Sequence, residues 1–147
     1  MLRHTSKLVV ISVVVFVAGV LFGTAIQPWS TLHAQSGKKV FEIRTYTANE
    51  GKLDALNARF RDHTIGIFAN HGMKSVGYWV PQDAPLKQNT LIYILEHPSR
   101  EAAAANWKAF GGDPEWQKAA AESEKQGKLV SKVESVFVEA TDYSPIK

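Results

Sequence analysis

The sequence predicts an α+β protein in which one folded domain, with the element order β-α-β-β-α-β, follows an apolar N-terminal segment. Three observations lead to this prediction. The chain has 147 residues, which suits one domain better than two. Its hydrophobic fraction of 45% and charged fraction of 21% are those of a globular protein and exclude a disordered chain. From residue 40 onward, segments with strand and helix patterns alternate, and glycine or proline separates them.

Residues 1–34 have the organisation of a signal peptide or a membrane anchor. Arg3 and Lys7 precede residues 8–26, which contain no charged side chain, and a short polar segment then leads to Ala34. This order of basic, apolar and polar regions is typical of a secretory signal. An apolar run of about 20 residues is also long enough to span a bilayer as a helix.

Both interpretations predict the same final location for the rest of the chain. Basic residues before an apolar run favour a cytoplasmic N-terminus, which places the following domain outside the cytoplasm. We therefore expect an exported protein that is periplasmic or secreted, or that is anchored in a membrane through residues 8–26. The sequence leaves open whether the chain is cleaved after Ala34.

Residues 35–39 form a short polar linker, and the folded domain is expected over residues 40–147. Alternating β-branched and aromatic side chains predict a strand over residues 40–47. Asn49 is a candidate cap for the helix that follows, and Gly72 is placed to end that helix. The side chains that recur at helical spacing are Leu53, Leu56, Phe60, Thr64, Ile67 and Phe68.

A second helical region is expected after Ser99, which is a typical N-cap residue. Gly111-Gly112 interrupts this region, and Asp113-Pro114 restarts it with a cap followed by proline at the first helical position. Gly127 ends it.

Three further strands are predicted, over residues 73–80, 90–97 and 129–139. With the two helical regions they complete the split βαβ arrangement of ferredoxin-like folds. Such a fold has an antiparallel sheet that carries both helices on one face. On the first strand, we expect Phe41 and Ile43 to face the helices.

Glu42, Arg44 and Tyr46 are then expected on the opposite face of that strand. The strand over residues 90–97 is apolar on both of its faces. Its two sets of side chains are Leu91, Tyr93 and Leu95 on one face, and Ile92 and Ile94 on the other. Because helices cover only one face, we expect a second copy of the chain to cover the other, in a homodimer packed sheet against sheet.

Five short segments occur in a characteristic order along the domain. They are Phe41-Glu42-Ile43-Arg44-Thr45-Tyr46, Gly51-Lys52-Leu53, Asn70-His71-Gly72, Gly77-Tyr78-Trp79 and Asp113-Pro114-Glu115-Trp116. Together they resemble the signature segments of the NIPSNAP family, over about residues 40–146. The resemblance implies a ferredoxin-like subunit that pairs into a dimeric α/β barrel. That architecture also serves cofactor-free monooxygenases, isomerases and haem-handling proteins, whereas the resemblance implies no particular reaction.

Arg44 and Tyr46 are the first candidates for ligand binding, because they offer a cation and a phenol to an anionic or carbonyl-bearing molecule. The alternative is that Glu42, on the same face, neutralises Arg44. Tyr78 and Trp79 are candidates for the apolar walls of the site, or they fill the core of a dimer.

His63 lies near the apolar stripe of the first helix and is a candidate general base. The alternative is a histidine at the edge of the core that binds the backbone. His71 is eight residues further on, about 12 Å along a helix, which is too far for the two to share a metal. We expect no metal and no cofactor.

Other function classes are excluded or disfavoured. The absence of cysteine excludes disulfides, thiolate metal sites and a catalytic thiol. No P-loop, dinucleotide-binding glycine motif or H-E-x-x-H motif is present. The net charge of +3 includes Arg3 and Lys7, and the rest of the chain is nearly balanced, so we expect no nucleic-acid partner.

These observations favour an exported homodimeric domain that binds a small apolar or carbonyl-bearing molecule. Arg44 and Tyr46 would orient that ligand between the walls formed by Tyr78 and Trp79. One alternative is a cofactor-free oxygenase or isomerase, with His63 as the base and Arg44 steadying an enolate. Another alternative is an interaction module without catalysis.

Overall fold

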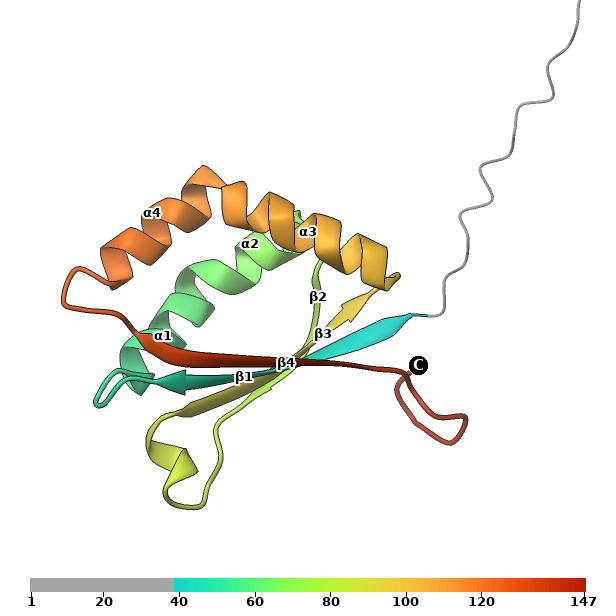
Figure 1. Ribbon diagram of the computed structural model, residues 1–147, viewed down its shortest axis with the longest axis horizontal. Helices are drawn as coiled ribbons and strands as arrows, with labels where there is room; N and C mark the ends of the chain where they lie inside the picture. The colour runs from blue at the N-terminus through green and yellow to red at the C-terminus, as the bar shows by residue number, and fades with distance from the viewer. Residues whose placement is uncertain (1–38) are drawn as a thin grey trace, which may run out of the picture. The chain divides into compact units, whose positions relative to one another are not determined.

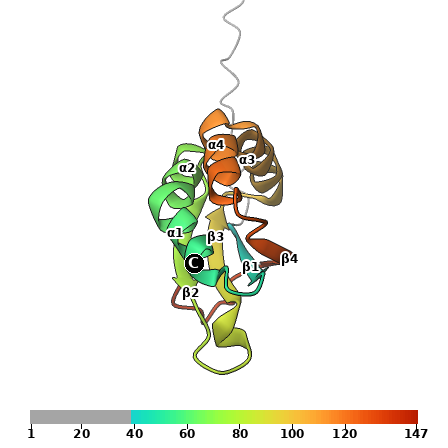
Figure 2. The same ribbon diagram turned by 90° about the vertical axis from the view of Figure 1, so that its left-hand side faces the viewer.

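The computed structural model describes residues 39–147, which form a four-stranded antiparallel sheet with the helices on one face (Figure 1 and Figure 2). The predicted element order is confirmed. The signal or anchor segment expected over residues 1–34, and most of the linker, lie outside the described residues. Within residues 39–147, no helix is both long enough and apolar enough to cross a membrane.

The strand order in the sheet is β2-β3-β1-β4, and every neighbouring pair is antiparallel. The strands are β1 (Val40–Ala48), β2 (Lys74–Trp79), β3 (Thr90–His97) and β4 (Val130–Val138). β1 therefore lies inside the sheet, while β4 forms one edge. This arrangement is consistent with the predicted ferredoxin-like fold.

The first helical segment is continuous but changes its helix type. Its parts are α1 (Leu53–Arg59), the π-helix η1 (Phe60–Thr64) and α2 (Ile65–Asn70). Gly72 ends the segment as predicted, with a φ of +69°. The predicted cap is wrong, because Lys52 occupies the N-cap position and the Asn49 side chain instead donates to the carbonyl of Lys128.

The second helical region is interrupted and restarted by the predicted residues. Its parts are α3 (Arg100–Gly112) and α4 (Pro114–Ser123), and a single 3-10 turn, η2 (Leu86–Gln88), lies between β2 and β3. The Ser99 side chain accepts from the backbone N–H of Ala102 and caps α3. Asp113 caps α4 by accepting from the N–H groups of Glu115 and Trp116.

The core lies between the sheet and the helices. β3 contributes Leu91, Tyr93 and Leu95, each at most 3% exposed, while the alternate isoleucines of the same strand are only partly buried. Leu56 of α1 and Phe68 of α2 pack against them. Both faces of β3 are thus apolar, as the sequence predicted.

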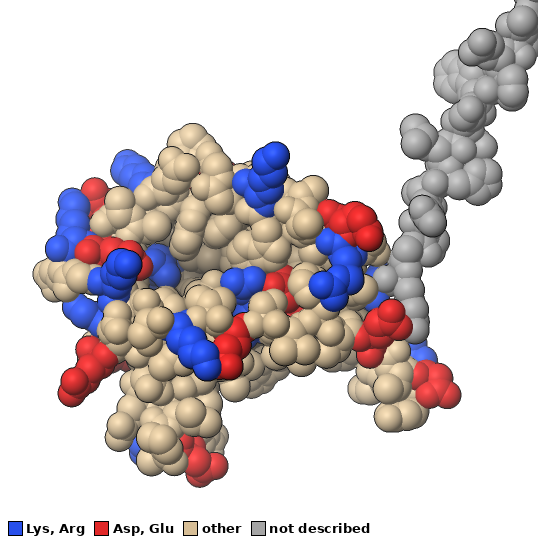
Figure 3. Space-filling view, viewed as in Figure 1, with Lys and Arg blue, Asp and Glu red and all other residues tan. Residues whose placement is uncertain are grey.

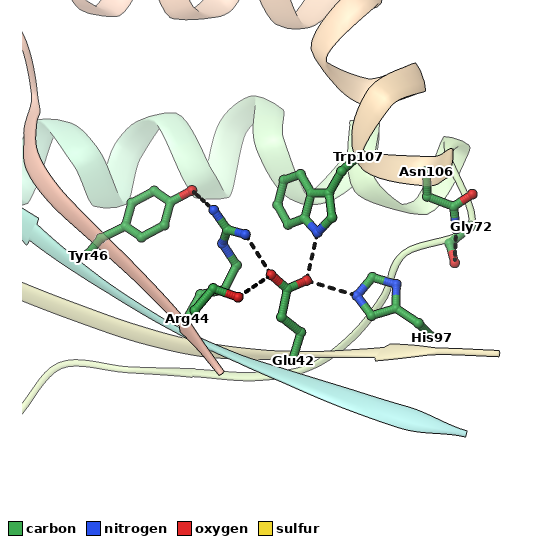
Figure 4. Close-up of polar contacts among 8 residues, drawn as sticks. Glu42, Arg44, Tyr46, Gly72, His97, Asn106 and Trp107 are labelled. Atoms are coloured by element: carbon green, nitrogen blue, oxygen red, sulfur yellow. Dashed lines mark hydrogen bonds and ion pairs between the residues drawn. The ribbon is translucent and has the colours of Figure 1, made fainter. Parts of the chain in front are cut away.

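The face assignment predicted for β1 is wrong. Glu42 and Arg44 point toward the helices, where Glu42 binds Trp107 of α3, and Tyr46 packs on Phe60 of η1 (Figure 4). Alternation separates the two faces of a strand but does not say which one the helices cover. The helical layer is the more favourable side here, because it supplies a hydrogen-bond donor and aromatic rings to these polar side chains.

The opposite face of the sheet is partly uncovered and has an apolar centre. The ion pairs Lys132–Glu134 and Lys74–Glu96 lie on the same face. Phe41 and Ile43 lie there, beside Ile94 of β3 and Val136 of β4. Residues 139–147 pass under one end of this face and cover Phe41 (Figure 1). Val136 remains 58% exposed.

Gly72→Ala is expected to destabilise the domain by about 1–2 kcal/mol, because an L-residue is strained at positive φ. The new Cβ would also lie 3.4 Å from Nδ2 of Asn106. Gly66→Ala is the matched control: this glycine is in α2 with open space around its Cβ, and alanine should stabilise the helix by about 0.5–1 kcal/mol. Urea unfolding measures both changes, and a Gly72→Ala variant as stable as the wild type would contradict the prediction.

Candidate functional site

A buried carboxylate lies at the centre of the helix-facing side of β1. Glu42 is 1% exposed and accepts four hydrogen bonds (Figure 4). Oε1 accepts from Arg44 Nη1 and from Ser135 Oγ, both at 2.6 Å. Oε2 accepts from Trp107 Nε1 at 2.6 Å and binds His97 Nε2 at 3.1 Å. The four partners come from β1, β4, α3 and β3, so this one group links the sheet to the helical layer.

The hydrogen bonds decide the charge of Glu42. Burial by itself raises the pKa of this carboxyl, but the bonds from His97, Ser135, Trp107 and Arg44 outweigh burial and lower the pKa to about 2. Glu42 is therefore ionised at neutral pH. Because an ionised carboxylate only accepts hydrogen bonds, Nε2 of His97 carries a proton.

Arg44 is held on three sides. Its Nη1 is paired with Glu42, and its guanidinium lies 4.2 Å from the Trp107 ring centroid. Its Nη2 lies 3.5 Å from the Tyr46 hydroxyl, which is a weak contact (Figure 4). The ion pair that the sequence left as an alternative is thus formed. Arg44 still keeps donor capacity, because its buried Nε has no partner within the described residues.

A cavity of about 280 Å³ lies next to this cluster, between the sheet and the helices. Its lining is mostly aromatic and apolar and comprises Tyr46, Arg59, Phe60, Thr64, Phe68, Phe110, Trp116, Ala120, Glu124, Val130 and Val133. Figure 3 shows the surface hollowed between the helices and the edge strand β4. Tyr46 joins the two parts of the site: its ring lines the cavity, and its hydroxyl contacts Arg44.

Arg59, at the end of α1, is a residue of this site that sequence reasoning missed. It is 6% exposed and lines the cavity. Its Nη1 donates to Glu124 at 3.2 Å and to Ser123 Oγ at 3.4 Å, and its guanidinium lies 5.2 Å from the Trp116 ring centroid. The signal was its position three residues after Leu56, on the buried stripe of the helix.

The π-helix η1 forms one wall of the cavity, and no pattern in the sequence indicates it. Phe60 and Thr64, its first and last residues, both line the cavity. The Thr64 hydroxyl donates to the carbonyl of Arg59 at 3.2 Å. Short π-helical turns inside α-helices occur often at functional sites, because they change which side chains point to one face.

Buried polar atoms without a partner gather around this site. Within residues 39–147 they are Arg44 Nε, Arg59 Nε, the Tyr93 hydroxyl and His97 Nδ1. Burial raises the pKa of the Tyr93 hydroxyl far above its usual value, so Tyr93 is neutral. Most buried polar groups in proteins are hydrogen-bonded, so these four atoms keep hydrogen-bonding capacity that the described residues do not use.

The structure brings some predicted site residues together and separates others. Tyr78 is near the cavity: its ring stacks on Tyr93 at 5.6 Å, and its hydroxyl bonds Ser75 at 2.6 Å. Trp79 is 49% exposed and covers Gly77 away from the cavity. Within the described part of the chain, no group of three histidine, aspartate or glutamate side chains is placed to hold a metal.

His63, the candidate base, is exposed and apart from the Arg44 cluster. It lines a different groove, between the first helical segment and α4. Asp62 and Glu122 line the same groove, and Arg59 separates it from the cavity because it lines both. The structure therefore does not bring His63 together with Arg44 or Tyr46.

The fold and the cavity define a small ferredoxin-like domain with a pocket between its sheet and its helices. The model of the NIPSNAP family matches residues 41–145, and the chain belongs to this family. Comparison with curated proteins gives no significant match.

Solved structures of family members have the same fold. A NIPSNAP family protein of unknown function from Agrobacterium tumefaciens is 23% identical, with 78% of this chain and 98% of that chain covered and a TM-score of 0.65. A second NIPSNAP family protein from that organism is 24% identical, with 74% of this chain and 99% of that chain covered and a TM-score of 0.65. A NIPSNAP-like domain protein from Burkholderia xenovorans is 19% identical, with coverages of 74% and 90% and a TM-score of 0.63.

Glu42→Gln is expected to remove a pH-dependent part of the stability. The pKa of Glu42 is lowered from 4.5 to about 2 on folding, so the unfolded chain binds more protons between these values. Ionised Glu42 then stabilises the fold by about 3 kcal/mol above pH ~5, and this is lost as the pH falls toward ~2. Urea unfolding over this pH range should show the wild-type advantage shrinking by that amount.

Glu50→Gln is the control, because the Glu50 carboxylate is exposed in the turn that follows β1. We expect it to change stability by less than about 0.5 kcal/mol. A difference between wild type and Glu42→Gln that stayed constant over the whole pH range would contradict the role given to the Glu42 charge.

Proposed function

We propose that this domain binds a small, largely apolar or carbonyl-bearing molecule in the cavity between its sheet and its helices. The observation that carries the proposal is the largely aromatic cavity of about 280 Å³, with the guanidinium group of Arg59 in its lining and that of Arg44 beside the lining residue Tyr46. Ligand pockets are mostly apolar and contain a few polar groups that fix orientation, and a cavity of this size suits a ligand of one or two rings.

Glu42 prepares the polar side of the pocket. Three of its hydrogen bonds hold the carboxylate in place, and the fourth holds Arg44. Arg44 is therefore ordered before a ligand binds, and little side-chain entropy is lost on binding. Tyr46 then extends this fixed cluster to the cavity wall. In this proposal the ligand lies inside each subunit, and not in the space between two sheets.

Filling the cavity should abolish binding without unfolding the domain. Ala120 lines the cavity, whereas Ala121 is the next residue of α4 and is exposed. With 2-acetylnaphthalene, an apolar ketone, as the probe, we expect calorimetry on the full-length protein to show binding to the wild type and to Ala121→Leu. Ala120→Leu should weaken it at least about tenfold, because the added side chain occupies the space. Equal binding to both variants would count against the cavity.

The open face of the sheet packs against a second copy of the chain in this proposal. Support comes from its apolar side chains, among which Val136 and Trp79 are 58% and 49% exposed in the single chain. The helices cover only the other face (Figure 1). An apolar area of this kind usually marks an interface.

Val136→Asp is expected to convert the dimer into a monomer, because it places a charge in the proposed interface. Ala104→Asp on the exposed side of α3 is the control and should leave the dimer intact. Sedimentation velocity at micromolar concentration measures both. A wild-type monomer, or a dimer that tolerates Val136→Asp, would refute this interface.

The enzymatic alternative gains no specific support from the structure. It needs His63 as a base beside Arg44, and His63 is exposed in another groove. A base role for His63 and the export of the domain both stay predictions. His63 lies outside the cavity, and the prediction of export rests on residues 1–34.

A further inference from the structure

One arginine, Arg59, lines the pocket and a second, Arg44, contacts the lining residue Tyr46; their surroundings differ. Arg44 is paired with Glu42, a carboxylate that is almost fully buried and already accepts four hydrogen bonds. Arg59 is paired with Glu124, whose side chain is 34% exposed. The Arg44 pair is therefore locked. Glu124 Oε1 accepts one further hydrogen bond, a long one of 3.4 Å from the backbone N–H of Leu129, so the partly exposed carboxylate beside Arg59 is held more weakly.

Arg59 is also the arginine that reaches the cavity. It is among the lining residues, and its side chain is only 5% exposed. Its two hydrogen bonds, to Glu124 and Ser123, are long and both come from Nη1. Its buried Nε has no partner within the described residues. A buried donor without a partner costs free energy that an incoming acceptor recovers.

The chemistry of this edge of Arg59 selects one kind of acceptor. The Nε–H and a neighbouring Nη–H of a guanidinium point in parallel and match the two oxygens of a carboxylate. Trp116, 5.2 Å from the guanidinium, supports its flat face. Beyond it, the rings of Phe60, Phe68 and Phe110 line the rest of the cavity and suit an apolar body.

We propose that Arg59 binds the carboxylate of an aromatic or similarly apolar monocarboxylic acid, whose hydrophobic body occupies the cavity. This inference rests on the proposed function and names the ligand class for the same pocket. Glu124 is the internal competitor for Arg59, and it turns outward when the ligand carboxylate takes its place. The ligand is thereby recognised by its charge as well as by its shape.

The test compares two probes of equal shape, 2-naphthoate and 2-acetylnaphthalene, by calorimetry on the full-length protein. We expect the wild type to bind the carboxylate about tenfold or more tightly than the ketone. Arg59→Gln should remove this preference, so that the two probes bind with dissociation constants within about threefold of each other. Arg61→Gln is the control, because Arg61 is an exposed arginine two residues along the same helical segment.

A second variant keeps the test decisive if Arg59→Gln does not fold. Glu124→Gln removes the competing charge and should strengthen 2-naphthoate binding several-fold relative to ketone binding, a gain that unfolding cannot mimic. Failure of the wild type to bind either probe would overturn the proposed function and this inference together. Equal binding of both probes, or a preference that survives Arg59→Gln, would overturn the role of Arg59 alone.

Discussion

The ionised carboxylate of Glu42 is the group on which the rest of the site depends. A charge buried to this degree is stable only when its lone pairs are satisfied, and here four donors from three strands and one helix do so. Removing any one donor leaves a buried acceptor short of a partner. The network therefore fixes the spacing between the sheet and α3, and with it the position of Arg44.

The cavity follows from the same spacing. α3 is bound to β1 by the hydrogen bond from Trp107 to Glu42. α4 packs on α3 through its own Trp116, whose ring centroid lies 4.5 Å from that of Phe110. The edge strand β4 is not covered over its whole length, and Figure 3 shows the hollow that remains beside it. An edge strand next to a helix break thus gives the domain a pocket that a fully covered sheet would lack.

The sequence could predict the elements but not the depth at which their side chains lie. Period-two and helical spacing located every strand and both helical regions, and Ser99, Asp113 and Gly72 act at the ends of helices as predicted. The prediction of which face of β1 the helices cover was wrong, because a Glu-x-Arg pattern normally marks the solvent side of a strand. It becomes internal here only because Trp107, 65 residues away, supplies a donor. Long-range pairing of this kind leaves no local pattern, and the π-helix that contributes Phe60 and Thr64 to the cavity lining leaves none either.

Because Glu42, Arg44 and Tyr46 face the helices, the proposed ligand site and the proposed dimer interface lie on opposite faces of the sheet. If Glu42, Arg44 and Tyr46 lay on the open face, a dimer partner would have to accommodate a buried ion pair, and ligand binding would depend on assembly. With these groups turned to the helices, the centre of the open face carries Phe41, Ile43 and other apolar side chains, and its ion pairs, such as Lys132 with Glu134, are exposed. Each subunit can then hold a complete pocket, and the sheet between pocket and interface serves both with its two opposite faces.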